Sequence, residues 1–446
     1  MTVASSSTNL LVGLGITGRA VATALLARGH RVVAIDDRPD DAVRSFVAAH
    51  GIELHEAPSM PVIEALVAGA DRVLPTPGLP DHHPVIRHAR RVDARIQSEF
   101  DLAAEWDPRP IAAVTGTDGK TTVTTMVADM LERSGVRAAL AGNNDVPLVE
   151  AIDDAAVEVF VVEASSFRLG HSEHFAPTVA TWLNFAPDHL EVHDSLESYE
   201  SAKAAVFAHQ TPTDTAIVNA DDPVVMRNLG RARRVTFSPE HGDFRVVHGV
   251  LTTDSGDAIV PVEELGRKLP HDVSNALAAA ATALAVGADI GRVADSLRAF
   301  TGLPHRIQFI AEHRGVRYVN DSKATVPHAV VTAVQCFPSV VLIAGGRNKG
   351  LDLGPLGEVA RRLRAVVAIG ESAPEVRAVF EPLGVRVADV ASMHEAVAAS
   401  AAMAAEGDTV LLSPGCASYD WYSSYAERGD DFTAAVAALG SRGEAR

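Results

Sequence analysis

A glycine-rich segment between an apolar run and a helical stretch constrains this chain more than any other feature. The segment is Thr115-Gly-Thr-Asp-Gly-Lys-Thr-Thr122, and Ile111–Val114 precedes it. Its glycines allow successive backbone amides to face a phosphate, while Lys120 can neutralise outer phosphates and Thr121 can offer its hydroxyl to Mg²⁺. The strict phosphate-loop pattern has a glycine where Val114 stands, so a solvated turn with an exposed lysine is the alternative interpretation. The segment predicts an α/β domain that binds a nucleoside triphosphate.

A second glycine motif opens the chain. Gly13-Leu-Gly15-Ile-Thr-Gly18 follows a short apolar run, and Asp36 ends the next predicted strand. This pattern is typical of dinucleotide-binding folds, in which the acidic residue holds a ribose. Helix N-terminal amides suit any diphosphate, so a UDP-sugar, NAD and a purely structural tight turn all remain open.

The rest of the chain alternates apolar runs with helical stretches, which is typical of α/β domains with mostly parallel sheets. A length of 446 residues is too great for one core. Breaks near Ser98 and at Gly302-Leu-Pro304 predict three domains, 1–98, 99–302 and 303–446. We expect irregular strand-like pieces over 235–262 and a helix over 274–286. The predicted strands begin near Leu10 and include 31–35, 72–74, 94–96, 111–114, 159–162, 179–184, 216–219, 316–320, 340–344, 365–369 and 409–412.

Acidic and basic residues follow the predicted central strands. Glu163 follows Val159–Val162, and His189 ends the segment Asn184-Phe-Ala-Pro-Asp-His189. Both fall at the carboxyl edge of a parallel sheet, where a metal-binding acid and an imidazole can meet a phosphate loop. His189 and His193 also have zinc-like spacing, but no third ligand is spaced to match. Lys203 lies in a predicted helical stretch, and the sequence favours neither a solvated nor a functional role for this lysine.

The last predicted domain gathers basic groups after its strands. Pro304-His-Arg306, Asn320-Asp-Ser-Lys-Ala-Thr325 and Gly345-Gly-Arg-Asn-Lys-Gly350 all fall at strand ends or linkers. Such groups can grip an acidic substrate or a phosphate, although the glycine pair also reads as a turn and Lys349 as a surface charge. Cys416 has no histidine placed as a base and reads as a packed residue.

Composition limits the partners. The formal net charge is −18 and no basic stripe occurs, which disfavours nucleic acid and anionic membranes. Two cysteines without paired spacing indicate a reducing cytoplasm, and the longest nearly apolar run, 276–288, is too short to span a bilayer. We expect a cytoplasmic, monomeric protein that acts on small molecules and binds neither nucleic acid nor membranes.

The ordered set of motifs resembles the Mur ligase family. It comprises TGTDGKTT, VVEASSFRL, NFAPDHL, SAKAAVF, SNALAAA, GLPHR, NDSKAT, GGRNKG and SPGCASYD, and it extends nearly from end to end. The resemblance implies a Rossmann-like UDP-binding domain, a central ATPase and a Rossmann-like C-terminal domain. It also implies ATP-dependent amide formation through an acyl phosphate, with D-glutamate added to UDP-N-acetylmuramoyl-L-alanine in peptidoglycan precursor synthesis.

The resemblance implies roles for individual residues. Lys120, Glu163, His189 and Lys203 would be catalytic, and Thr121, Glu163, His189 and a carbamylated Lys203 would hold Mg²⁺, with two ions expected. ATP would contact Gly116, Thr117, Gly119, Lys120, Thr121, Thr122, Asn275, Arg306, Asp321 and Lys323. The UDP-sugar would contact Gly15, Thr17, Asp36, Asp37, Arg38, Pro77, Gly78, Asn143 and His189. The incoming amino acid would contact Thr325, Lys349, Ser418 and Tyr425.

Several residues depart from the family pattern. Asp118 replaces the usual Asn or Ser, His271-Asp272 replaces His-Asn, residue 425 is Tyr rather than Phe, and Asn143-Asn-Asp145 replaces a glycine turn. Asp118 adds negative charge beside a polyanion, which disfavours ATP unless it faces away or meets a metal. The alternatives are a ligase for L-glutamate or another amino acid, an NAD-dependent dehydrogenase, and a non-catalytic nucleotide-binding module.

Overall fold

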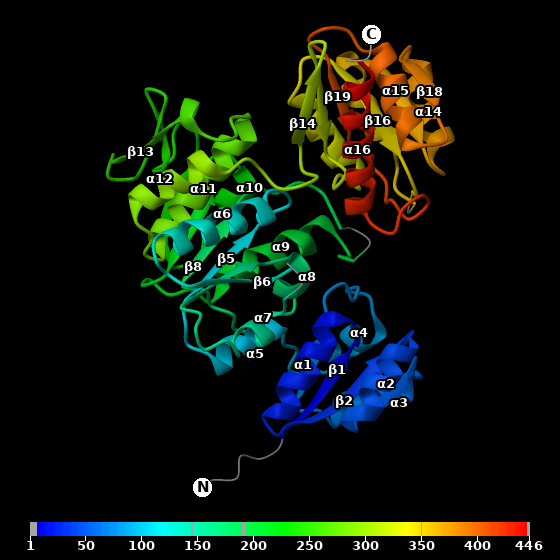
Figure 1. Cartoon of the computed structure of the whole chain (residues 1–446). Coiled ribbons are helices and arrows are strands. Elements are labelled where there is room, and N and C mark those ends of the chain that lie inside the picture. The colour runs from blue at the N-terminus through cyan, green and yellow to red at the C-terminus, as the bar shows by residue number, and fades with distance from the viewer. Residues whose placement is uncertain (1–6, 144–145, 190–191, 349, 444–446) are drawn as a thin grey trace. The chain divides into compact units, whose positions relative to one another are not determined.

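The computed structural model describes residues 7–143, 146–189, 192–348 and 350–443. The chain divides into two compact units, Met1–Phe300 and Thr301–Arg446. Both are built from largely parallel sheets covered by helices (Figure 1), so the predicted α/β class is confirmed. Within the described part of the chain, none of the helices is long and apolar enough to cross a membrane.

Unit 1 begins with a four-stranded parallel sheet in the order β3-β2-β1-β4. The predicted strand at 94–96 contributes only a single bridge, between Ile96 and Val73. The strands are β1 (Thr8–Val12), β2 (Arg31–Asp36), β3 (Glu53–Glu56) and β4 (Arg72–Pro75), and the helices are α1 (Ile16–Ala27), α2 (Asp41–His50), α3 (Met60–Ala68) and α4 (Pro84–Arg91).

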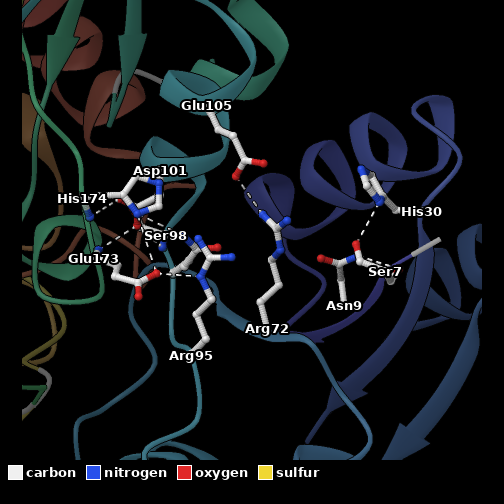
Figure 2. A network of polar contacts seen from close by, with 11 residues as sticks. Ser7, Asn9, His30, Arg72, Arg95, Ser98, Asp101, Glu105, Glu173 and His174 are labelled. Carbon is white, nitrogen blue, oxygen red and sulfur yellow. Dashed lines mark hydrogen bonds and ion pairs between the residues drawn. The ribbon is translucent and has the colours of Figure 1, made fainter. Parts of the chain in front are cut away.

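The segment that follows this sheet forms hydrogen bonds to both neighbouring sheets, as Figure 2 shows. α5 (Glu99–Trp106) begins with a capping box in which the Asp101 carboxylate accepts from the Ser98 amide. The same carboxylate accepts from the amides of Glu173 and His174, each at 3.0 Å. Arg72 of β4 bonds Glu105 at 3.1 Å. α5 is therefore joined both to the first sheet and to a loop of the next one.

The second sheet of unit 1 has six parallel strands in the order β10-β9-β8-β5-β7-β6. They are β5 (Ile111–Thr115), β6 (Ala138–Gly142), β7 (Val159–Glu163), β8 (Val179–Trp182), β9 (Thr215–Asn219) and β10 (Arg233–Phe237). The helices are α6 (Lys120–Arg133), α7 (Leu148–Ala151), α8 (Ser166–Leu169), α9 (Leu196–Ala208), α10 (Pro223–Arg227), α11 (Pro270–Ala285) and α12 (Ile290–Ala299).

The irregular segment predicted over 235–262 contains β10 and a small antiparallel sheet. Its strands are β11 (Arg245–Val247), β12 (Val250–Thr252) and β13 (Ala258–Pro261), followed by the 3₁₀ helix η1 (Val262–Glu264). α11 begins four residues before the predicted start, because Pro270 suits a first helical turn and the Asp272 carboxylate accepts from the Leu269 amide at 3.2 Å.

One apolar core explains why the first 300 residues form a single compact unit. It runs without interruption from Leu11 and Leu25, on the first sheet and α1, through Phe100 of α5 to Phe160 and Trp182 of the second sheet. A second core fills the other face of that sheet beneath α6, α11 and α12. Burial of this scale is the main term that fixes both sheets in one body.

Unit 2 has a six-stranded sheet in the order β14-β15-β19-β16-β17-β18, in which only β14 is antiparallel. The strands are β14 (Gln308–His313), β15 (Val316–Asn320), β16 (Val340–Gly345), β17 (Leu363–Ile369), β18 (Arg386–Asp389) and β19 (Thr409–Leu412). The helices are α13 (Pro327–Gln335), η2 (Gly354–Arg362), α14 (Ala373–Phe380), η3 (Glu381–Leu383), α15 (Met393–Met403) and α16 (Tyr425–Gly443).

Candidate active site

The glycine-rich loop after β5 is held by a residue that follows a neighbouring strand. Gly119 has a φ of +85°, a backbone conformation that residues with a side chain rarely adopt, and α6 begins at the next residue. The side-chain oxygen of Asn184 accepts from the amides of Thr117 (3.0 Å) and Asp118 (2.9 Å). β8 ends at Trp182, two residues before the predicted end, because Asn184 bonds the loop instead of continuing the ladder.

Two lysines meet on one carbonyl of this loop. Lys120 Nζ donates to the carbonyls of Gly116 (2.9 Å) and Thr117 (2.8 Å), and Lys203 Nζ donates to the same Gly116 carbonyl at 2.7 Å. Lys203 lies on α9 with only 1% of its surface exposed. Burial, followed by the charge of Lys120, lowers the pKa of Lys203 well below its usual range. The structure thus places a lysine with a strong tendency to be uncharged beside the phosphate loop.

Glu163 ends β7 with one carboxylate oxygen paired and one unpaired. Its Oε1 accepts from the Asn143 side-chain amide at 3.0 Å, whereas its buried Oε2 has no hydrogen-bond partner. A buried carboxylate oxygen without a donor is costly unless a cation or another donor meets it. Asn143, which the resemblance assigns to the UDP-sugar, contacts Glu163 because β6 and β7 are adjacent.

His189 lies in the loop after β8 with a φ of +56°. Its Nε2 is 3.3 Å from the Asp188 carboxylate, and its ring packs edge-on against Phe167 at 4.7 Å between centroids. His193, one turn further, bonds Ser166 and Asp81 through its two ring nitrogens. Among the described residues, no three His, Cys, Asp or Glu side chains are grouped for a metal, which gives the zinc interpretation no support.

The residues present nevertheless fit Mg²⁺. The unpaired Oε2 of Glu163 is a hard oxygen donor, and Thr121, the second residue of α6, carries a hydroxyl. Lys203 becomes a third oxygen donor only if its amine is carbamylated. That modification would give the set three oxygen donors, the ligand type that Mg²⁺ prefers, beside the imidazole of His189.

The carboxyl edge of the first sheet gathers the residues expected to bind the UDP-sugar. Adjacent parallel strands β1, β2 and β4 bring Gly15, Asp36, Asp37 and Gly78 to one edge. Asp36 accepts from the amide of Leu14 at 2.8 Å through Oδ2 and from that of Arg38 at 3.0 Å through Oδ1. Pro77 also follows β4 at this edge.

A buried arginine ties the same edge to the second sheet. Arg168 on α8 donates to the hydroxyl of Thr17 at 3.1 Å and forms a buried ion pair with Glu99. Glu99 also accepts from the amide of Val149 at 3.1 Å. Sequence reasoning missed this role of Arg168, because its partners lie 69 and 151 positions away in the chain.

Asn275 of α11 also reaches the phosphate loop. A Cβ added to Gly119 would lie 2.8 Å from Asn275 Oδ1, so the two are in close approach. Asn275 and Thr122 line a small cavity together with Arg267 and Asp272. Asp272, which departs from the family pattern, is buried and paired with Arg267 at 3.0 Å. Its carboxylate is therefore neutralised within the protein.

In unit 2, the expected residues collect at the carboxyl edge of adjacent strands β15, β19 and β16. Asp321 accepts from the amide of Ile307 at 3.2 Å and from the hydroxyl of Ser413 at 2.8 Å. Lys323 Nζ lies 4.0 Å from the centre of the Tyr425 ring. Ser418 is buried, and Arg306 and Thr325 lie on the same edge. Lys349 lies outside the described residues, as do Asn144 and Asp145 in unit 1.

Sequence reasoning also missed Arg428 of α16. Its buried guanidinium donates to the hydroxyl and carbonyl of Ser322 (3.0 and 2.9 Å) and to the carbonyl of Cys416 (3.1 Å). Burial lowers its pKa to about 10. Arg428 thus ties two strand-end loops of this edge together.

Comparisons with known proteins match this arrangement. The family described as "Mur ligase middle domain" matches residues 114–283, and "Mur ligase, glutamate ligase domain" matches residues 305–416. A protein of Frankia casuarinae named UDP-N-acetylmuramoylalanine--D-glutamate ligase is 42% identical, over 96% of this chain and 93% of that protein. A protein of the same name from Desulfosudis oleivorans is 38% identical, over 98% and 97%.

Solved structures share the fold at lower identity. UDP-N-acetylmuramate-alanine ligase of Thermotoga maritima is similar with a TM-score of 0.58 and 20% identity, over 97% of this chain and 100% of that one. A pseudomurein peptide ligase type C of Methanothermus fervidus gives a TM-score of 0.56 and 19% identity, over 91% and 96%. These two likenesses concern the fold alone.

Proposed function

This chain belongs to the Mur ligase family, and on that premise we propose that it joins D-glutamate to UDP-N-acetylmuramoyl-L-alanine in an ATP-dependent amide ligation. The full-length likeness to relatives of that name supports the substrate pair. The observation that carries the reaction type is the meeting of Lys120 and Lys203 on the Gly116 carbonyl. A nicotinamide-dependent dehydrogenase or a non-catalytic module would give neither lysine a role.

The reaction proceeds by making a poor leaving group into a good one. The terminal carboxylate of UDP-N-acetylmuramoyl-L-alanine attacks the γ-phosphorus of ATP, which forms an acyl phosphate and releases ADP. The amine of D-glutamate then attacks the acyl carbon, and phosphate leaves with the electron pair of the broken bond. Lys120 offsets the negative charge of the two anions that approach each other.

Lys203 is suited to carbamylation. A neutral amine attacks the carbon of CO₂, forms an N–C bond as one C–O π pair moves to oxygen, and releases one proton to solvent, which converts the neutral amine into a carboxylate-like anion. Burial and the charge of Lys120 both favour the neutral amine that this step needs. The product also replaces a repulsion between two ammonium groups with an attraction to Lys120.

Mg²⁺, when bound, neutralises phosphate oxygens and polarises the γ-phosphoryl group. Thr121, Glu163, His189 and carbamylated Lys203 would hold it, with two ions proposed. Asn143 orients the Glu163 carboxylate through its side-chain amide.

The remaining assignments come from the family resemblance. Asp36, Asp37, Arg38, Thr17 and the Pro77-Gly78 turn are proposed to hold the UDP moiety. In unit 2, Arg306, Asp321 and Lys323 are proposed to contact the nucleotide, and Thr325, Lys349, Ser418 and Tyr425 the amino acid. Since ATP is consumed, we propose a cytoplasmic enzyme, working as a monomer.

The deciding experiment measures phosphate release from ATP and Mg²⁺ with UDP-N-acetylmuramoyl-L-alanine. D-glutamate, L-glutamate and no amino acid are compared, and the product mass is recorded. Release with an amide product only for D-glutamate supports the proposal. A product with L-glutamate alone overturns the choice of amino acid, and no amide product under any of the conditions overturns the ligase function.

A further inference from the structure

A buried serine, histidine and aspartate form a chain of hydrogen bonds between the two sheets of unit 1. His193 Nε2 is 2.9 Å from Ser166 Oγ, and His193 Nδ1 is 3.3 Å from Asp81 Oδ2. The exposed fractions are 2% for Ser166, 4% for His193 and 8% for Asp81. Asp81 precedes α4 of the first sheet, whereas the other two residues belong to the second. We refer to these residues as the Asp81–His193–Ser166 chain.

The direction of each hydrogen bond follows from the chemistry of the groups. Burial lowers the pKa of His193, which favours the neutral ring. A carboxylate only accepts, so Nδ1–H donates to Asp81 and Nε2 accepts from the Ser166 hydroxyl. Burial opposes ionisation of Asp81, but Arg90, bonded to its other oxygen at 2.8 Å, outweighs this and lowers the pKa of the carboxyl.

The same three residue types catalyse hydrolysis in serine hydrolases, where the serine must reach a substrate carbonyl. Ser166 is almost fully buried in the first turn of α8, which leaves no approach for such a substrate. The Asp81–His193–Ser166 chain is therefore better suited to positioning the elements around it than to nucleophilic attack.

Each end of the Asp81–His193–Ser166 chain lies next to one of the proposed binding sites. On the first sheet, His83 follows Asp81 by two residues, and its Nε2 is 3.1 Å from the carboxylate of Asp37 at the UDP edge. The amide of Asp81 also donates to the carbonyl of Val192 at 2.9 Å.

On the second sheet, the Asp81–His193–Ser166 chain is connected to the two segments that carry the proposed metal ligands His189 and Glu163. The His193 amide donates to the carbonyl of His189 at 3.0 Å, which ties the backbone of the two histidines together. Ser166 begins α8 three residues after Glu163. A shift of Asp81 would be transmitted to both of these elements through hydrogen bonds that are shielded from water.

We infer that Asp81, His193 and Ser166 are positioning residues that couple occupancy of the UDP-sugar site to the binding of Mg-ATP. The inference rests on the proposed function, because it takes the first-sheet edge as the UDP-sugar site. It assigns the Asp81–His193–Ser166 chain a role in aligning His189 and Glu163, without contact with either substrate.

The test measures this coupling directly by calorimetry. The Kd of a non-hydrolysable ATP analogue with Mg²⁺ is determined with and without saturating UDP-N-acetylmuramoyl-L-alanine. Coupling between sites is commonly about 5–150-fold. The coupling ratio is the Kd without UDP-N-acetylmuramoyl-L-alanine divided by the Kd with it. We expect Asp81→Ala and Ser166→Ala each to bring this ratio close to 1, a reduction of at least about fivefold, the equivalent of about 1 kcal/mol. The Kd of the analogue alone stays within about twofold of the wild-type value.

Two further variants separate coupling from loss of structure. Asp81→Asn keeps one acceptor oxygen, which can serve His193 or Arg90 but not both, so it retains more of the coupling than Asp81→Ala and less than the wild type. Arg95→Met removes another contact between the same two sheets, the 2.8 Å ion pair with Glu173 (Figure 2), which touches neither His193 nor its loop. This matched control keeps the wild-type coupling.

The inference is overturned if Asp81→Ala and Ser166→Ala couple like the wild type, or if Arg95→Met loses as much coupling as they do. It is also overturned if the wild type forms the amide product but shows no coupling. Should Asp81→Ala fail to fold, Ser166→Ala, which removes one atom, decides the matter. Absence of amide product from the wild type would instead refute the proposed function, so the two failures are distinguishable.

Discussion

Replacing Lys203 with methionine should stabilise the protein and abolish its activity. Lys203 is buried with a lowered pKa, and its ammonium form is repelled by Lys120. Methionine has a similar length and carries no group that needs solvation. The substitution loses one hydrogen bond, about 1 kcal/mol, but Gly116 still accepts from Lys120 at 2.9 Å and is not left unpaired. Removal of the desolvation cost and the repulsion outweighs that loss.

We expect a net gain of about 1 kcal/mol in the free energy of unfolding, or about 1–2 °C in Tm for a unit of the size of Met1–Phe300. Turnover should fall at least about 100-fold, the upper end of the roughly 10–100-fold loss seen for groups that only orient a metal ligand, because Lys203 is proposed to be a ligand itself. The assays are thermal unfolding and phosphate release, both at neutral pH. Unfolding is first measured in buffer stripped of CO₂, so that the wild-type reference is the free amine.

Bicarbonate provides the internal control for this prediction. Added bicarbonate should raise the Tm of the wild type, because a carbamate at Lys203 attracts Lys120, and should leave Lys203→Met unchanged. Two results would refute the reasoning: a Tm for the variant more than 2 °C below that of the wild type in CO₂-free buffer, or turnover at the wild-type rate.

Three further predictions test separate features. Lys120→Ala should abolish phosphate release with an unfolding midpoint close to that of the wild type, and normal turnover would exclude the phosphate-binding role. Gly18→Ala should cost about 2–3 kcal/mol in denaturant unfolding, since its Cβ would lie 2.2 Å from the Gly13 carbonyl oxygen, whereas Gly15→Ala meets nothing within 4 Å and should stay within about 0.5 kcal/mol. Burial lowers the pKa of His171 to about 4 from its ordinary 6.5, so between these values the unfolded chain binds a proton that the folded chain does not. The free energy of unfolding should therefore fall by about 3 kcal/mol as pH drops from about 6.5 to about 4, and His171→Gln should lack that dependence.

The strands that the sequence did not reveal are edge strands. β3 and β6 are edges of the two large sheets of unit 1, and β14 and β18 are both edges in unit 2. A central parallel strand is covered on both faces and reads as a continuous apolar run, as Val159–Val162 does. An edge strand is partly exposed, so Glu53-Leu-His-Glu56 and Arg386–Asp389 are as polar as loops. Periodicity could not separate them from loops.

The residues of the candidate site also differ in how far the sequence alone could predict them. Lys120, Glu163 and His189 could be predicted because each follows a strand that is obvious from its apolar residues, and parallel strands share a carboxyl edge. The interpretation of Lys203 depended on burial, which an alanine-rich helix does not reveal. Roles such as that of Arg168 arise only from tertiary partners, here Glu99 and Thr17, which no local pattern indicates.

Three residues at the proposed metal and phosphate site of unit 1 have features that lower the stability of the protein. Glu163 keeps a buried oxygen without a donor, Lys203 carries a buried amine beside a second cation, and His189 adopts a positive φ. Each feature costs free energy in the isolated protein, and a bound cation and an anionic phosphate chain would offset the cost at Glu163 and at Lys203. Elsewhere the same unit pairs its buried charges, as Asp272 with Arg267. Because Glu163 and Lys203 both belong to the proposed metal and phosphate site, binding of Mg-ATP should stabilise unit 1 by more than contact with surface groups alone would provide.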